Sequence, residues 1–241
     1  MFIDTHCHIK KDDIEEMNKM GKNIMILGGS DPASNIENLK LKKDNIFITL
    51  GLHPECADTY KEDDIKFIED NIDKICAIGE IGLDYYYTKD NIEKQKELFI
   101  KQLELAKKYN KTVVIHSRDS IMDTYNILKE YKEIPKVIHC YSGSLEMAKQ
   151  FISINSMLGI GGVVTFKNAK TLQNVVENIP LEYLVLETDS PYLAPEPLRG
   201  TKNEPYNVTY IAKKIAELKN IDVNEVYRIT TNNAIKQFNI N

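Results

Sequence analysis

Eight short apolar stretches recur along this chain of 241 residues, and longer polar segments separate them. The apolar stretches are rich in β-branched residues, as buried strands are, whereas the segments between them show helical periodicity. They occupy residues 2–8, 23–28, 46–51, 75–80, 112–117, 136–141, 156–161 and 183–188. About eight βα units in this length predict an α/β fold, namely a (β/α)8 barrel of the TIM type. A doubly wound open sheet is the alternative.

The segments between the strands carry the usual signals of helices. Residues 91–109 place Leu98, Leu103, Leu105 and Ala106 near helical spacing, and acidic residues open the segment 62–73, as suits a helix N-terminus. The expected helices span 62–73, 91–109, 119–131, 144–153, 168–178, 206–218 and 223–238. Because no repeat, linker or low-complexity segment interrupts this pattern, we expect one domain over residues 1–241.

Composition narrows the functional classes. The net charge of −5 argues against a protein that coats nucleic acid with a broad basic surface, although a local cationic pocket stays possible. No apolar run is long enough to span a bilayer, and no signal-peptide pattern opens the chain, so we expect a cytoplasmic protein without a membrane partner. The four cysteines lack CxxC spacing and are expected to be buried free thiols.

Residues that commonly bind metals gather at the predicted strand ends. All five histidines lie at or just after such an end, and so do two acidic residues. The residues are His6, His8, His53, Glu80, His116, His139 and Asp189. Because the carboxyl ends of parallel strands meet at one end of a barrel, we expect these side chains to converge.

Strand geometry refines this expectation. Side chains alternate between the two faces of a strand, so His6 and His8 point the same way, into the barrel mouth. By the same argument Cys7 and Cys140 point away from the site, and neither is counted as a ligand. A histidine pair at this spacing can hold one metal ion from a single strand.

Six of these residues form the predicted metal site: His6, His8, Glu80, His116, His139 and Asp189. Any one histidine at a strand end is more often a hydrogen-bonded structural residue, but burying all six groups without a cation would cost several kcal/mol. Six ligands exceed the needs of one four-coordinate ion and suit two divalent metal ions, with Glu80 bridging them. The imidazole-rich set favours Zn, Mn, Ni, Fe or Co over a lone Mg, although occupancy by Mg or Mn stays open.

Several segments together resemble the TatD-related hydrolases, a branch of the metal-dependent amidohydrolase superfamily. The matching segments occur in family order, span residues 2–200 and read FIDTHCHI, GLHP, GEIGLDYY, VIHSRD, IHCYSG and ETDSPYLAP. The resemblance implies a TIM-type barrel and a metal-dependent deoxyribonuclease that hydrolyses phosphodiester bonds. It also implies metal binding at the six positions named above.

Roles for individual residues follow as hypotheses. Asp189 would bind a metal and orient or deprotonate the attacking water, the alternative being a turn or helix cap before Ser190 and Pro191. Arg118 could bind a phosphate through its guanidinium or form an ion pair with Asp84 or another carboxylate at the barrel mouth.

Three further features near the site stay open. His53 could hydrogen-bond the phosphate or leaving group, or support the GLHP turn. Arg199 could contact the substrate backbone at the rim or be solvated. A tyrosine of the run 85–87 could stack on a base, but loop tyrosines more often pack on a helix, and no role is assigned to them.

The leading hypothesis is a nuclease acting on DNA ends or single strands, with DNA as its partner and the monomer as its expected state. The second keeps the metals and changes the bond, as in a D-aminoacyl-tRNA deacylase acting on RNA or in another ester or amide hydrolase. The third is a metal-binding protein without catalysis, against which the intact ligand set speaks.

Overall fold

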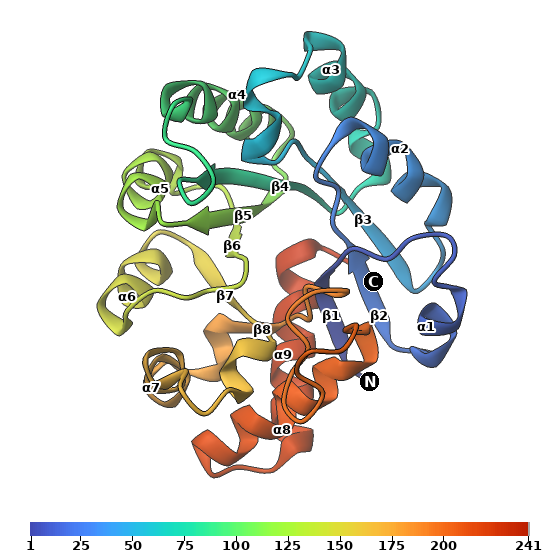
Figure 1. The fold of residues 1–241 in the computed structure, drawn as a ribbon, viewed down its shortest axis with the longest axis vertical. Helices are drawn as coiled ribbons and strands as arrows, with labels where there is room; N and C mark the ends of the chain where they lie inside the picture. Colours follow the sequence, from blue (N-terminus) through green and yellow to red (C-terminus); the bar gives the residue numbers. More distant parts are fainter. Residues whose placement is uncertain (241) are drawn as a thin grey trace.

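The computed structural model describes residues 1–240 and contains eight parallel strands in one sheet, ordered β1 to β8 along the chain (Figure 1). Each strand pairs in parallel with the strand that follows it. The strands are β1 (Ile3–Cys7), β2 (Ile24–Leu27), β3 (Ile46–Leu50), β4 (Ala77–Asp84), β5 (Thr112–Arg118), β6 (Lys136–Ile138), β7 (Ser156–Ile160) and β8 (Leu184–Leu186). A doubly wound sheet would require a reversal in the strand order, and this sheet has none. The predicted barrel is therefore confirmed.

The barrel closes between β1 and β8 through a few contacts at their ends. Cys7 and Ser190 form an isolated parallel bridge, and the amide of His8 donates to the carbonyl of Ser190 at 2.6 Å. The buried carboxylate of Asp4 accepts hydrogen bonds from the amide and hydroxyl of Thr188 at 2.9 and 2.5 Å. This seam brings the residues after β8 next to His6 and His8.

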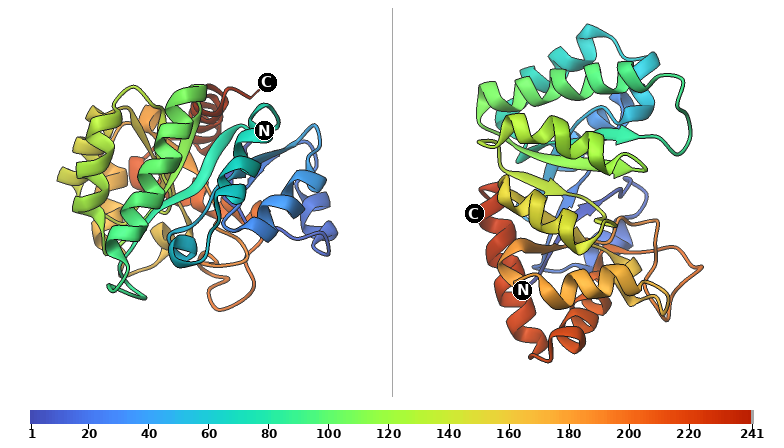
Figure 2. Two further views of the ribbon diagram at one scale, coloured as in Figure 1. Left: turned by 90° about the horizontal axis from the view of Figure 1, so that it is seen from above. Right: turned by 90° about the vertical axis from the view of Figure 1, so that its left-hand side faces the viewer.

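Nine helices of the described chain lie outside the ring of strands (Figures 1 and 2). They are α1 (Ile14–Lys19), α2 (Pro32–Leu41), α3 (Glu62–Asp70), α4 (Ile92–Tyr109), α5 (Ile121–Leu128), α6 (Leu145–Ser153), α7 (Lys170–Asn178), α8 (Val208–Lys219) and α9 (Val223–Phe238). Helices α1 and α2 are not among the helices expected from the sequence. In α2 the buried side chains include Asn35 and Asn38, so no clear apolar stripe marks the helix. Its usable signal was Asp31 before Pro32, because the Asp31 carboxylate caps the helix.

Two strand ends differ from the prediction in ways that matter for the site. Strand β4 continues to Asp84, so Glu80 lies inside the strand and not at its end. The register between β4 and β5 shifts around Glu80, between Ile78 and Ile81. Strand β6 stops at Ile138, which leaves His139 and Cys140 in the following loop.

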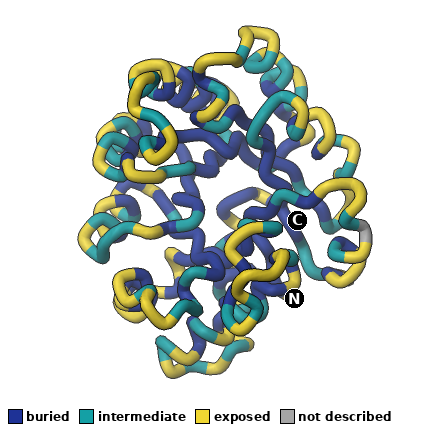
Figure 3. The backbone as a smooth tube through the Cα atoms, viewed as in Figure 1, coloured by how far each residue is buried: buried dark blue, intermediate teal, exposed yellow. Residues whose placement is uncertain are grey.

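Helix α9 closes the amino-terminal end of the barrel. Its Ala234 and Phe238 pack against one small apolar residue from each of six strands: Ile3, Ile26, Ala77, Val114, Val137 and Val185. Gln237 adds a hydrogen bond to the carbonyl of Lys136, the first residue of β6. The strands are buried and the outer faces of the helices are exposed (Figure 3). Ligands must therefore enter from the carboxyl end.

No helix in residues 1–240 combines the length and apolar character needed to cross a membrane.

Candidate metal centre

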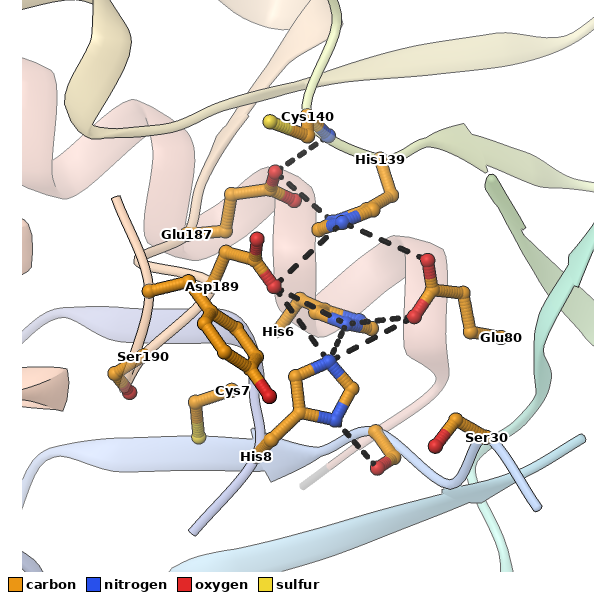
Figure 4. Close-up of polar contacts among 12 residues, drawn as sticks. His6, Cys7, His8, Ser30, Glu80, His139, Cys140, Glu187, Asp189 and Ser190 are labelled. Carbon is orange, nitrogen blue, oxygen red and sulfur yellow. Dashed lines mark hydrogen bonds and ion pairs between the residues drawn. The ribbon is translucent and has the colours of Figure 1, made fainter. Parts of the chain in front are cut away.

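His6 in β1 and His8, the residue that follows β1, project into the carboxyl end of the barrel, and their Nε2 atoms lie 3.0 Å apart (Figure 4). The ring of His6 is buried and occupies the space beside Gly28, where a Cβ atom would come within 2.6 Å of His6 Cε1. His8 points its other ring nitrogen at the carbonyl of Gly28, 3.1 Å away. The end of β2 thus fixes both rings.

Glu80 lies at the centre of the site, and its two oxygens face different histidines. Oε2 is 3.4 Å from His6 Nε2 and 3.7 Å from His8 Nε2. Oε1 is 2.7 Å from His116 Nδ1 and 3.8 Å from His139 Nε2. A carboxylate so placed can bridge two cations.

Asp189 completes the first group of donors. It follows β8 with a left-handed backbone (φ 55°), and its Oδ1 is 3.5 Å from His8 Nε2, 3.8 Å from His139 Nε2 and 4.0 Å from His6 Nε2. The structure therefore brings together all six residues predicted as metal ligands.

Two carboxylates that were not predicted as metal ligands contact His116 and His139, each at the ring nitrogen that faces away from Glu80. His116 Nε2 is 2.9 Å from Asp84 Oδ2, and His139 Nδ1 is 3.0 Å from Glu187 Oε1. The second contact lacks the direction of a hydrogen bond and is an ionic one. Such outer partners orient metal-binding imidazoles. Asp84 and Glu187 could have been recognised as acidic residues near strand ends, the pattern that singled out Glu80 and Asp189.

Burial and charge shift the pKa values of the central groups. Burial opposes protonation of His116, but hydrogen bonds to Asp84 and Glu80 outweigh it and raise the pKa of His116 to about 9. Burial is likewise outweighed at His139 by the charges of Glu187 and Glu80, which raise its pKa to about 10. Burial would raise the pKa of Glu80, but the charge of His139 and the other histidines hold it well below its usual range. A cation and the histidine protons therefore compete for the same pocket.

The donor set fits divalent cations. Ligand atoms about 2.1 Å from a tetrahedral ion lie about 3.4 Å from one another. The separations among His6, His8 and Asp189 run from 3.0 to 4.0 Å and include that value. The surrounding cavity of about 700 Å³ is lined by six carboxylates, four histidines, Lys10 and Arg118. When the histidines are neutral, as metal ligands are, bound cations would balance the excess of carboxylates.

His53 lies at the edge of the site and serves the local turn as well. Its Nδ1 accepts a hydrogen bond from the amide of Glu55 at the start of the turn η1 (Pro54–Asp58), and its Nε2 lies 4.0 Å from Glu80 Oε1. Burial lowers the pKa of His53 to about 4, so the imidazole is neutral at pH 7. His53 therefore supports the GLHP turn through Nδ1, and its Nε2 is available to a ligand.

The two arginines lie in different surroundings. Arg118 ends β5 and lines the cavity, with its guanidinium 3.7 Å from the ring centroid of Tyr86. The alternative of an ion pair with Asp84 is not observed, because Oδ2 of Asp84 pairs with His116 instead. Arg199 lies over Phe166, 4.4 Å from its ring centroid, and is not among the residues that line the cavity.

The expected orientation of Cys140 is wrong, whereas that of Cys7 agrees with the structure. Cys7 is buried and directs its sulfur to the carbonyl of Ile26. Cys140 lies beyond β6 with a left-handed backbone (φ 45°), so strand alternation does not apply to it. Its sulfur, a nitrogen of His139 and an oxygen of Asp189 all lie within 4.8 Å of one another. All four cysteines are free thiols, of which Cys56, Cys76 and Cys140 are partly exposed.

A parallel barrel whose carboxyl end gathers histidines and carboxylates around one cavity is the architecture of the amidohydrolase-type, metal-dependent hydrolases. Comparison with known proteins narrows this class. The family model described as TatD related DNase matches residues 3–239, and the chain belongs to this family of metal-dependent hydrolases. The resemblance noted in the sequence is confirmed.

Individual relatives agree with this assignment. The uncharacterized metal-dependent hydrolase YabD of Bacillus subtilis is 39% identical, with 100% of both chains covered. The uncharacterized metal-dependent hydrolase YcfH of Escherichia coli is 33% identical over 99% of this chain and 96% of its own. The crystal structure of the TatD homolog YjjV from Escherichia coli superposes with a TM-score of 0.91 at 28% identity, covering 100% of this chain and 98% of the other.

Proposed function

We propose that the protein is a metal-dependent deoxyribonuclease that hydrolyses phosphodiester bonds at DNA ends or in single strands, using two divalent metal ions. The observation that carries the proposal is the position of Glu80, whose Oε2 faces His6 and His8 while its Oε1 faces His116 and His139. One carboxylate between two groups of donors suits a pair of ions about 3.5–4 Å apart.

The residues divide the work as follows. His6, His8 and Asp189 would hold one ion, His116 and His139 would hold the other, and Glu80 would serve both. When bound, the ions lower the pKa of a water molecule and neutralise charge on the phosphate. Asp189, whose Oδ1 faces the same space as three histidine nitrogens, would orient this water and accept its proton.

Phosphate recognition rests on two further residues. Arg118 directs a guanidinium into the cavity without a carboxylate partner, and His53 offers a neutral Nε2 beside Glu80. Six carboxylates face Lys10 and Arg118 in the cavity lining, so with its histidines neutral, as metal ligands are, the cavity would repel a polyanion unless cations were bound. Contact of Arg199 with the substrate stays a prediction.

A substrate panel tests the proposal. Protein loaded with Mn²⁺ or Zn²⁺ and chelated protein are compared on labelled single-stranded DNA, duplex DNA, RNA and a D-aminoacyl-tRNA, with metal analysis of the same preparations. We expect metal-dependent cleavage of DNA. Deacylation of the tRNA without DNA cleavage would replace the proposal by the second enzyme hypothesis, and no turnover at all would favour a metal-binding protein.

Variants separate metal binding from phosphate binding. His6→Ala and Glu80→Ala should lower both bound metal and the rate of DNA cleavage, because each removes a donor. Arg118→Ala should retain its metal and lose at least about tenfold in kcat/KM, since a charge-assisted hydrogen bond contributes about 1.5–3 kcal/mol. An Arg118→Ala enzyme with wild-type kinetics would remove the phosphate role of Arg118.

A further inference from the structure

Two exposed tyrosines and Arg118 form a ledge beside the metal centre. Tyr86 and Tyr87 are 58% and 65% exposed, although large aromatic side chains are usually buried. Their rings meet edge to face with centroids 5.0 Å apart, and the guanidinium of Arg118 lies 3.7 Å from the centroid of Tyr86 and 5.1 Å from that of Tyr87. We call these three residues the tyrosine–arginine ledge.

The ledge is built on a fixed base. Its backbone continues from β4, and the neighbouring Tyr85 turns inward, where its hydroxyl donates to Asp123 at 2.9 Å. The amide of Tyr85 donates to the carbonyl of Arg118, and the amide of Tyr86 donates to Asp84, both at 2.9 Å. The same Asp84 holds His116, so one carboxylate links the ledge to the metal centre.

The two tyrosines differ in what they face. Tyr87 and Arg118 line the cavity, whereas Tyr86 does not. Tyr86 packs against one face of the guanidinium, so that the N–H groups at its edge can reach a phosphate. Tyr87 offers an aromatic face to whatever lies next to that phosphate.

We propose that the ledge is the subsite for the nucleotide beside the scissile phosphate, with Tyr87 stacking on its base and Tyr86 holding Arg118 for the phosphate. This inference rests on the proposed nuclease function and adds a preference for an unpaired base, because a base inside a duplex is stacked on both faces and cannot also lie on a side-chain ring. Stacking on any base is possible, so the ledge favours single-stranded DNA without selecting its sequence.

The test compares two single-stranded oligodeoxynucleotides that differ only in their end nucleotides, which carry bases in one and are abasic in the other. Binding is measured by fluorescence anisotropy with metal-loaded protein and phosphorothioate linkages that slow hydrolysis. Cleavage is measured as kcat/KM on the same strands with ordinary linkages. The proteins are wild type, Tyr87→Ala, Tyr87→Phe and the control Tyr183→Ala, which changes an exposed tyrosine at the other end of the barrel.

Wild type and Tyr183→Ala should prefer the base-bearing strand by about 5- to 150-fold, the range expected for one stacked base. Tyr87→Ala should lose this preference, and Tyr87→Phe, which keeps the ring, should retain it. A preference that survives in Tyr87→Ala would overturn the ledge, while the nuclease function would stand if DNA is still cleaved. Base-dependent binding without cleavage would support the ledge and refute the nuclease, and absence of both would refute the two together.

Discussion

At the scale of single residues, the metal centre depends on contacts that lie one step outside it. Asp84 and Glu187 each approach the outer nitrogen of a histidine whose inner nitrogen faces Glu80. Glu187 is fully buried, accepts a hydrogen bond from the amide of Cys140 at 2.5 Å and lies against Gly159, where a Cβ atom would meet Oε2 at 2.2 Å. We infer that Glu187 is a positioning residue for His139.

Glu187→Gln keeps the shape of the side chain and an oxygen for the Cys140 amide, but removes the charge beside His139. We expect metal affinity to fall about 10- to 100-fold with little change in the folded structure. Metal titration followed by circular dichroism of the same samples measures both quantities. The exposed Glu177→Gln should bind metal as wild type does, and equal affinity in the two variants would contradict the role of Glu187.

At the scale of elements, β6 begins at a buried lysine that joins two neighbouring segments. The ammonium of Lys136 donates to the carbonyls of Ile134, at 2.6 Å, and Ile154, the residue after α6, at 2.7 Å. Burial lowers the pKa of Lys136 to about 8. The strand is only three residues long, so these bonds help to place the end that leads to His139.

The pKa of Lys136 predicts a pH dependence of stability. Between about pH 8 and pH 10.5 the unfolded chain keeps the Lys136 proton and the folded chain loses it, so the free energy of unfolding gains a contribution that rises with pH. Lys136→Met lacks this contribution. The stability of wild type relative to Lys136→Met should therefore increase across this window, by at most about 3 kcal/mol.

Urea unfolding of both proteins at pH 7, 8, 9 and 10 measures this difference. A constant difference at all four pH values would show that Lys136 titrates normally in the folded protein.

At the scale of the whole molecule, the two ends of the barrel have separate tasks. Helix α9 seals the amino-terminal end with Phe238, which is 1% exposed, whereas the carboxyl end holds the polar cavity. Figure 2 shows α9 on one side of the barrel and the long connection between β8 and α8 on the other.

Phe238→Ala should therefore lower the free energy of unfolding by about 3–5 kcal/mol, because it leaves a cavity among small apolar side chains. The number of metal ions bound by the folded variant and its KM should match those of wild type. Denaturant unfolding and metal analysis test the two statements, with the exposed Ile36→Ala as the control. Loss of metal from folded Phe238→Ala would show that the two ends are coupled.

The sequence by itself determined the barrel and the type of chemistry. Strand periodicity and β-branched composition are local properties, and eight such stretches in one chain leave few folds available. The positions of the histidines relative to these stretches then place the site at the carboxyl end, since parallel strands all point the same way. The two-residue repeat of a strand predicted that His6 and His8 point the same way, and their Nε2 atoms meet.

Only the tertiary structure decided how the polar groups meet. Glu80, whose two oxygens face different histidines, lies where the pairing of β4 with β5 is irregular, and no residue pattern reports this irregularity. Asp84 and Glu187 became recognisable through their distance to His116 and His139, and Cys140 turned toward the site because its backbone is left-handed. Arg118 packs on Tyr86 and forms no ion pair with Asp84, whose carboxylate is paired with His116. Contacts between separate strand ends depend on loop backbone and on competition among partners, and both are settled only when the whole barrel has closed.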